Sequence, residues 1–300
     1  MTLARPVFPG RYYMVTRNCT QRQFLLRPDK ETNENYLYCL AEAAQRFDIT
    51  ILQATAMSNH HHPIIYDRWG LRNEFTEHFH KMFSKSQNRL RGRKENLWSS
   101  EQVNLVELVD VSDVIDKIVY SATNPVQAGL VEKAHHWPGV NTLSALLEGR
   151  TIKVKRPKFF FRADGPMPEE IELRVGLPPE LGDPDPLLDT IRRKVAQVEE
   201  RMAAARRQTG ARVLGRRGVL AQSWKATPST VRGPRDIRPQ IAARETWRRL
   251  EAIQRNRDFQ RAYRAARERL VANDPIPFPP GTYWLRRFAN VPIANLPIHS

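Results

Sequence analysis

The sequence predicts an α+β protein in which helices flank an antiparallel sheet, followed by a mostly helical and strongly basic C-terminal region. Two observations support this prediction. Over about the first 145 residues, strand-like and helix-like patterns alternate in the order β-α-β-β-α-β-α, which is typical of a layered domain with an antiparallel sheet. Almost all of the excess positive charge lies instead in the last third of the chain.

The elements of the first half follow from the spacing of apolar residues. Helices are expected where apolar residues recur at three- and four-residue steps, and strands where β-branched and aromatic residues gather. These signals predict strands over residues 11–16, 49–55, 62–66 and 102–109 and helices over residues 29–47, 71–90 and 114–123. Asp29 is the expected N-cap of the first helix, and Asn124-Pro125 is expected to end the third.

The second half divides into a proline-rich segment and a basic extension. Seven prolines crowd residues 157–186, which is typical of a linker or an irregular wrap rather than a domain core. Helical patterns return over residues 187–207 and 241–273, with glycines and arginines between them at residues 210–218. The expected organisation is a layered domain over residues 1–148, a linker or wrap over 149–190 and a basic, mainly helical extension over 191–300.

The charge distribution indicates the class of partner. The formal net charge is +16, and residues 201–290 hold 21 Lys and Arg against 6 Asp and Glu, with Arg making up 20 of the 21. Guanidinium groups match phosphate oxygens two at a time and stack on bases, so this bias favours nucleic acid. A solvated basic surface is the alternative. The candidate DNA-binding residues are Arg17, Arg212, Arg216, Arg217, Lys225 and Arg248.

The glycine- and arginine-rich stretch at residues 210–218 has two readings. Two short helices around a glycine turn would form a helix-turn-helix. A basic loop that contacts phosphates without reading sequence fits the same residues.

The composition also indicates a compartment. No apolar run approaches the roughly 18–20 residues needed to cross a bilayer. The N-terminus has no apolar core of the kind a secretory signal carries. Cys19 and Cys39, the two cysteines of the chain, provide no disulfide framework. We therefore expect a cytoplasmic, nucleoid-associated protein with no membrane partner.

Three consecutive histidines, His60, His61 and His62, are the first candidate for chemistry. Side chains alternate between the two faces of a strand, so His60 and His62 are expected on one side and His61 on the other. Two imidazoles on one face are a ready pair of ligands for a divalent metal. Taken alone, the triplet fits a polar turn with surface histidines equally well.

Tyr120 and Asn124 are the second candidate. They stand four residues apart on a predicted helix, so their side chains share a face. A phenol has a pKa near 10 and is a poor nucleophile at neutral pH. A divalent ion makes a phosphodiester a better electrophile and stabilises charge on the attacking and leaving oxygens. The amide oxygen of Asn124 is a candidate third ligand for such an ion, whereas the structural alternative for Tyr120 is ordinary packing.

These two candidates lie in stretches that resemble a known family. Residues 57–62 (MSNHHH) are similar to the metal-binding strand of the HUH single-tyrosine transposases, and residues 119–131 (VYSATNPVQAGLV) to their nucleophile helix. The REP-associated tyrosine transposases are the most similar in pattern. The segments TRNC, QRQFL and LW near residues 16, 21 and 97 agree as well, so the resemblance covers about residues 5–145.

The resemblance implies a fold and a reaction. The fold would be the HUH domain, a ferredoxin-like layer with an antiparallel sheet flanked by helices. His60, His62 and Asn124 would hold Mg²⁺ or Mn²⁺. Tyr120 would attack a phosphodiester of single-stranded or hairpin DNA, forming a 5′-phosphotyrosine link and freeing a 3′-OH. A homodimer is compatible with this reading.

The sequence departs from the family pattern at three positions. His61 stands where the family has an apolar residue, Ser58 replaces a proline, and Pro63 follows the second histidine where a strand should continue. Proline removes a hydrogen-bond donor from a strand, so Pro63 predicts either a bulge or a distorted site. The alternative function is therefore a domesticated or degenerate sequence-specific DNA-binding protein without cleavage activity. An RNA-binding protein is a third reading.

Overall fold

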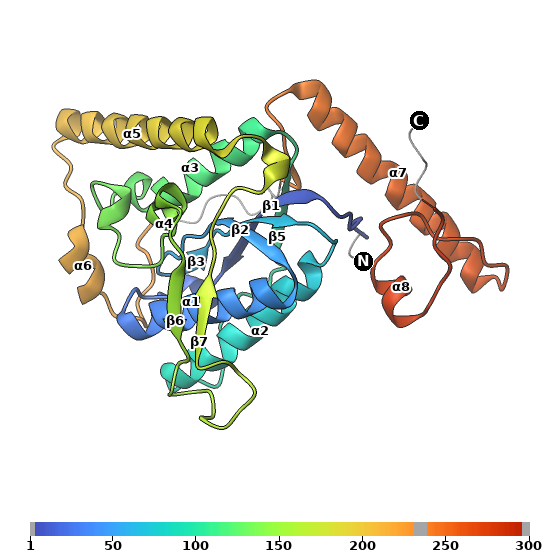
Figure 1. Cartoon of the computed structure of the whole chain (residues 1–300), viewed down its shortest axis with the longest axis horizontal. Helices are drawn as coiled ribbons and strands as arrows, with labels where there is room; N and C mark the ends of the chain where they lie inside the picture. Colours follow the sequence, from blue (N-terminus) through green and yellow to red (C-terminus); the bar gives the residue numbers. More distant parts are fainter. Residues whose placement is uncertain (1–3, 231–238, 296–300) are drawn as a thin grey trace.

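Helices and strands alternate through the first half of the chain. The computed structural model describes residues 4–230 and 239–295 (Figure 1). The first half forms β1 (Arg11–Asn18), α1 (Lys30–Arg46), β2 (Ile49–Gln53), β3 (His60–His61), β4 (Ile64–Asp67), α2 (Arg72–Leu90), β5 (Asn104–Leu108), α3 (Val111–Gln127) and α4 (Leu143–Glu148). Short 3-10 turns stand at Thr20–Arg22 and Ala134–His136.

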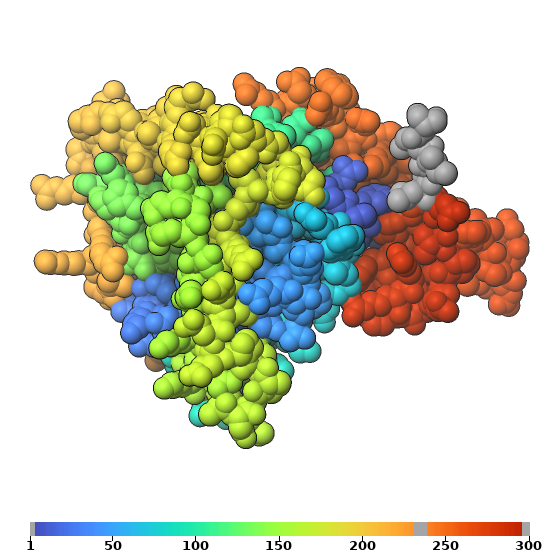
Figure 2. All heavy atoms as spheres, in the orientation of Figure 1, coloured from blue at the N-terminus to red at the C-terminus, as the bar shows by residue number. Residues whose placement is uncertain are grey.

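The second half adds two small strand pairings and two long helices. Its elements are β6 (Ile152–Lys155), β7 (Glu170–Leu173), a 3-10 turn at Pro179–Leu181, α5 (Pro184–Thr209), α6 (Gly215–Ala221), β8 (Ile241–Ala242), α7 (Thr246–Val271) and α8 (Trp284–Phe288). In the space-filling view, the segment after residue 245 projects from one side of the N-terminal half (Figure 2).

The main sheet has six strands in the order β2-β4-β1-β5-β8, with β3 pairing to β1. The α+β class with flanking helices is therefore confirmed. The sheet is mixed rather than wholly antiparallel, because β8 pairs with β5 in parallel and the other strands pair antiparallel. Helices α1 and α2 contact the face that carries His61, and α3 contacts the face that carries His62.

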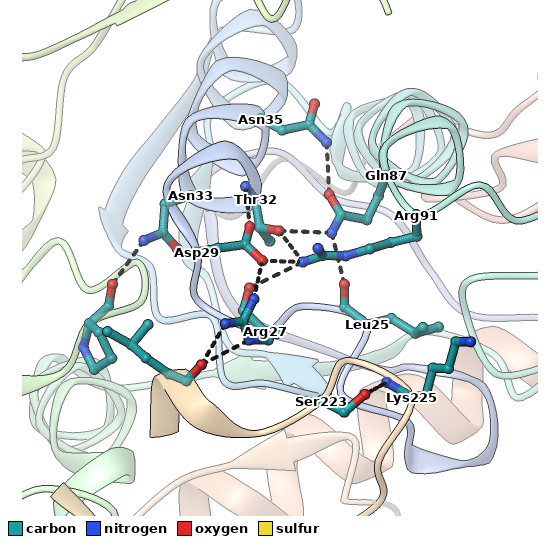
Figure 3. A network of polar contacts seen from close by, with 12 residues as sticks. Leu25, Arg27, Asp29, Thr32, Asn33, Asn35, Gln87, Arg91, Ser223 and Lys225 are labelled. Atoms are coloured by element: carbon teal, nitrogen blue, oxygen red, sulfur yellow. Dashed lines mark hydrogen bonds and ion pairs between the residues drawn. The ribbon is translucent and has the colours of Figure 1, made fainter. Parts of the chain in front are cut away.

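The first helix begins as its sequence predicts. Asp29 is the N-cap of α1, and its carboxylate accepts a hydrogen bond of 2.9 Å from the backbone N–H of Thr32. The same carboxylate pairs with Arg27 at 3.1 Å and with Arg91, the C-cap of α2, at 2.6 Å (Figure 3). Arg27 also donates to the backbone carbonyl of Leu220, which ties α6 to the start of α1 (Figure 3).

The third helix does not end at Asn124-Pro125 as predicted. It runs from Val111 to Gln127, with Pro125 inside its last turns. A proline at this position loses the hydrogen bond from its own nitrogen and crowds the carbonyl four residues earlier, but few helix residues follow it. Pro125 and Val126 are buried, and their packing holds the final turn in place. Tyr120 and Asn124 therefore lie on one continuous helix.

Two other boundaries differ from the sequence prediction. Residues 241–273 do not form a single helix, because Ile241 and Ala242 pair with β5 as the edge strand β8 before α7 begins at Thr246. The predicted strand over residues 62–66 is replaced by β3 and β4, which end and begin on either side of Pro63. In both cases a short pairing with a distant strand decides the boundary.

The proline-rich segment contains more regular structure than an irregular wrap. Strands β6 and β7 pair antiparallel and pack on α1, with Val154, Ile171 and Leu173 buried. The residues around 210–218 do not form two short helices. The long helix α5 ends at Gly210, whose φ of 67° is left-handed, and the seven-residue α6 follows. None of the helices in the described ranges is long and apolar enough to span a membrane.

Candidate nucleophile and metal site

Two of the three consecutive histidines face the same side of the sheet. In the pairing of β3 with β1, His61 lies opposite Arg17 and His60 opposite Asn18. The ring centroids of His60 and His62 are 4.7 Å apart. The alternation expected of a strand is therefore confirmed: His60 and His62 form a pair, and His61 points to the other face.

His61 belongs to the core under α1 and α2. Its side chain is fully buried, and its Nδ1 lies 2.8 Å from the hydroxyl of Tyr36. Its Nε2 lies 3.0 Å from Nε2 of His80, and its ring stacks on Trp98 with centroids 5.1 Å apart. Both ring nitrogens are thus occupied by protein partners, so His61 does not contribute a ligand to the side where His60 and His62 meet.

The paired histidines are held through their Nδ1 atoms. Thr16 Oγ1 lies 3.0 Å from Nδ1 of His62, and Asn59 Oδ1 lies 2.6 Å from Nδ1 of His60. A hydrogen bond at one ring nitrogen orients the imidazole and leaves the other nitrogen to bind. Nε2 of His62 is buried and has no hydrogen-bond partner within the described residues.

Burial keeps both imidazoles neutral. Burial of the His60 ring, with the charge of Arg22 as the smaller cause, lowers its pKa to about 4. Burial of His62, assisted by the neighbouring imidazoles and by Lys117, holds its pKa well below the usual value of 6.5. At pH 7 both rings are therefore neutral, and a neutral imidazole carries a lone pair on one nitrogen that can bind a metal.

Tyr120 faces this histidine pair from α3. Its ring centroid lies 5.7 Å from that of His62, and 38% of its side chain is exposed. The next residue, Ser121, fixes the distance between helix and strand, because its buried hydroxyl donates to the carbonyl of His62 at 2.7 Å. Asn124 lies one turn further along the same helix face and is half-buried.

The residues present fit a divalent metal with a mixed ligand set. Within the described ranges, no group of three His, Cys, Asp or Glu side chains gathers in a way that could hold an ion. A site on this face would therefore combine the nitrogens of His60 and His62 with an oxygen ligand, such as the amide of Asn124 or water. The unpartnered, buried Nε2 of His62 supports this fit, because a buried polar atom without a partner is costly.

Pro63 interrupts the strand without shifting its register. The β4 pair Met14–Ile64 and the β3 pair Arg17–His61 are three positions apart on both strands, so the alignment with β1 continues unchanged across the proline. The carbonyl of Pro63 still accepts a hydrogen bond of 2.9 Å from the backbone of Val15. Only the reciprocal bond from the proline nitrogen is lost. The irregularity of the sheet lies instead in β2, between Ile51 and Gln53.

Two cations that the sequence analysis did not single out lie beside the histidines. Nζ of Lys117 lies 5.6 Å from the ring centroid of Tyr120. The guanidinium of Arg22 donates to the backbone carbonyl and the hydroxyl of Thr230, at 2.7 and 3.1 Å. The three-residue spacing of Lys117 and Tyr120 would have indicated the first cation, whereas Arg22 depends on contacts that no local pattern reveals.

The predicted DNA-binding residues are spread over the molecule. Arg17 is half-buried, stacks on Trp98 with a distance of 5.4 Å and lies on the sheet face opposite Tyr120. Arg248 forms an ion pair with Asp110 at the start of α3. The remaining four are exposed around α6: Arg212, Arg216, Arg217 and Lys225.

Comparison with known proteins shows a weak similarity. No family model matches the sequence, and no curated protein matches it. Among solved structures, the chain is similar to one described as "Structure of the REP associates tyrosine transposase bound to a REP hairpin". The identity is 18% and the TM-score 0.42, over 49% of this chain and 86% of that chain. A similarity of this size is too small to transfer a function.

Proposed function

We propose that this protein is an HUH-type tyrosine transposase that cleaves and rejoins single-stranded or hairpin DNA. The hydroxyl oxygen of Tyr120 attacks a phosphodiester, forms a 5′-phosphotyrosine link and releases a 3′-OH. Attack by another 3′-OH on that link reverses the step. The covalent intermediate conserves the phosphodiester bond energy, so the reaction needs no ATP.

The observation that carries the proposal is that Tyr120 lies next to the pair formed by His60 and His62. A tyrosine with a partly exposed ring lies 5.7 Å, centroid to centroid, from a neutral imidazole whose buried Nε2 has no hydrogen-bond partner among the described residues. A structural tyrosine and a structural histidine gain nothing from this arrangement, because a buried unpaired nitrogen costs stability. A nucleophile beside two available ligands is what metal-assisted phosphoryl transfer requires.

Each residue of the site has a distinct role in this reaction. His60, His62 and Asn124 would hold Mg²⁺ or Mn²⁺, which when bound polarises the phosphodiester and offsets charge on its oxygens. Thr16 and Asn59 orient the two imidazoles through Nδ1. These residues are brought together by the β1–β3 pairing and by α3.

The basic extension would supply binding to the DNA backbone. Exposed arginines around α6 stand next to the end of α3, because the backbone N–H groups of Leu214 and Gly215 donate to the carbonyls of Gly129 and Leu130. Phosphate contacts of this kind position DNA without reading its sequence, and their strength falls as salt rises.

Covalent trapping tests the proposal directly. The purified full chain is incubated with a labelled pool of hairpin oligonucleotides whose single-stranded flanks are randomised, in Mn²⁺ or Mg²⁺, and is then run on a denaturing gel. We expect labelled DNA at the size of the protein in the metal lanes and none with EDTA. Tyr120→Phe should abolish the labelled band because it lacks the nucleophilic oxygen.

A matched variant separates the nucleophile from tyrosines in general. Tyr263→Phe removes one phenol oxygen from α7, where the ring packs against Phe259 and Phe278, and should leave the labelled band intact. DNA that binds on a native gel but is never attached covalently would contradict the proposal and favour the non-cleaving DNA-binding protein.

A further inference from the structure

Lys117 places a positive charge beside the proposed nucleophile. It stands one helical turn before Tyr120 on α3, and its Nζ lies 5.6 Å from the Tyr120 ring centroid. Lys117 is half-buried, and this contact places its ammonium over the Tyr120 ring.

This ammonium has no carboxylate partner among the described residues, although acidic residues are near. Asp116, its neighbour in sequence, pairs with Lys194 of α5. Asp113 accepts a hydrogen bond of 3.0 Å from the backbone N–H of Asp110 in the helix cap. Burial raises the pKa of Asp113, and the charge of Lys117 opposes that rise at longer range. Because Lys117 forms no ion pair with these acids, its ammonium can still bind an anion.

The place of that anion follows from the surrounding groups. In the proposed reaction, the scissile phosphate must lie within reach of the Tyr120 hydroxyl and of the side where His60 and His62 meet. Lys117 is a cation whose ammonium lies beside the Tyr120 ring. A lysine ammonium is a compact donor that binds phosphate oxygens as a point charge.

We propose that Lys117 is a catalytic residue whose ammonium binds a non-bridging oxygen of the scissile phosphate. This inference rests on the proposed function. During attack, the bond from the Tyr120 oxygen to phosphorus forms while the bond from phosphorus to the 3′-oxygen breaks. The electron pair of the broken bond stays on the 3′-oxygen, which takes a proton from water, and the phenolic proton passes to solvent. Lys117 keeps its proton throughout and offsets the negative charge that builds on the phosphate oxygens.

The test measures single-turnover formation of the covalent adduct at saturating oligonucleotide pool. Lys117→Met keeps the length of the side chain and removes the charge, and it should slow adduct formation on the order of 10²-fold. Lys117→Arg should recover part of the rate, because it restores a cation at the same place. Lys81→Met, on the exposed side of α2 across the sheet, makes the same charge change and should keep the wild-type rate.

A phosphorothioate substitution gives a second readout that folding alone would not move. Sulfur in place of the contacted oxygen weakens the hydrogen bond from lysine. The sulfur should therefore slow adduct formation by the wild-type protein by a larger factor than it slows adduct formation by Lys117→Met. Mn²⁺ binding, measured by calorimetry, should be no weaker in Lys117→Met than in the wild type, because a nearby cation has been removed, and this would show that the histidine site is intact. A purely structural lysine would leave the sulfur effect unchanged.

The outcomes distinguish this inference from the function on which it rests. A wild-type adduct with an unchanged rate in Lys117→Met overturns the role of Lys117 and leaves the transposase proposal standing. Absence of any adduct from the wild-type protein, with metal and the full pool present, overturns both. A slowed Lys117→Met with rescue by Lys117→Arg supports both.

Discussion

A histidine that binds a metal through Nε2 depends on the group that holds its Nδ1. The hydrogen bond at Nδ1 fixes the tautomer and the ring orientation, so its loss weakens binding even though no ligand is removed. Thr16 has this relation to His62 at 3.0 Å, across the β1–β3 pairing. It is the polar partner of a proposed ligand whose buried Nε2 has no hydrogen-bond partner in the part of the chain that the structure describes.

We therefore expect Thr16→Val to weaken Mn²⁺ binding by about tenfold, because valine keeps the shape of threonine and lacks its hydroxyl. Titration calorimetry of the metal-free protein measures the affinity. Thr50→Val on β2 is the control, since it makes the same change on a strand that does not carry the histidines. An unchanged Mn²⁺ affinity in Thr16→Val would show that the metal does not use His62 Nε2.

The sequence predicts which face of an element a side chain lies on better than it predicts which distant side chain it contacts. The two-residue period of a strand was enough to separate His60 and His62 from His61, and the four-residue step was enough to join Tyr120 and Asn124. Thr16 was not predictable in the same way, because it meets His62 from a strand 46 positions away in sequence. Side-chain hydrogen bonds of this range depend on strand pairing that no local pattern contains.

At the scale of elements, the strand that carries the histidines tolerates a proline. The ladder with β1 keeps one register on both sides of Pro63, and one hydrogen bond is lost. The missing hydrogen bond would contribute about 0.5–1.5 kcal/mol to the free energy of unfolding. Proline restricts the unfolded chain, and this restores about 0.4–1 kcal/mol of that loss. The net effect of Pro63 on stability is therefore small.

This balance predicts that Pro63→Val changes the free energy of unfolding by no more than about 1 kcal/mol and leaves adduct formation at the wild-type rate. Urea unfolding and the covalent trapping gel measure the two quantities. Both quantities are compared with those of the wild-type protein. A large gain of adduct in Pro63→Val would contradict the prediction. It would mean that the proline distorts the site.

The sequence predicts whether a segment is a helix or a strand better than it predicts where that element begins and ends. Helices of 17 and 19 residues, α1 and α2, have enough turns for their apolar spacing to be read, and the N-cap at Asp29 is local chemistry. The predicted end of α3 at Asn124-Pro125 is wrong, because burial of Pro125 and Val126 outweighs the local tendency of proline to stop a helix. The two-residue strand β8 has no periodicity to detect and exists through its pairing with β5.

At the scale of the whole molecule, charge composition and charge pairing carry different information. The sequence shows that arginine dominates residues 201–290, but it does not show which guanidinium groups are occupied. The structure separates two sets. Several exposed arginines form ion pairs with acidic neighbours: Arg207 with Glu200, Arg261 with Asp258 and Arg269 with Asp274. Others, at residues 212, 216 and 217, have no ion pair among the described residues and lie around α6.

This separation makes a prediction about DNA binding, because each phosphate neutralised by a free cation releases counterions and steepens the dependence of affinity on salt. Arg212, Arg216 and Arg217, changed together to alanine, should lower the slope of log affinity against log salt by up to about 3. The matched control changes the three ion-paired arginines instead. Both variants lose the same net charge, so a difference between their slopes reports where the DNA lies rather than how basic the protein is. Fluorescence anisotropy with the hairpin pool over a salt series measures the slopes. Equal slopes in the two variants would contradict a DNA path over α6 and would leave general attraction to the basic surface as the source of binding.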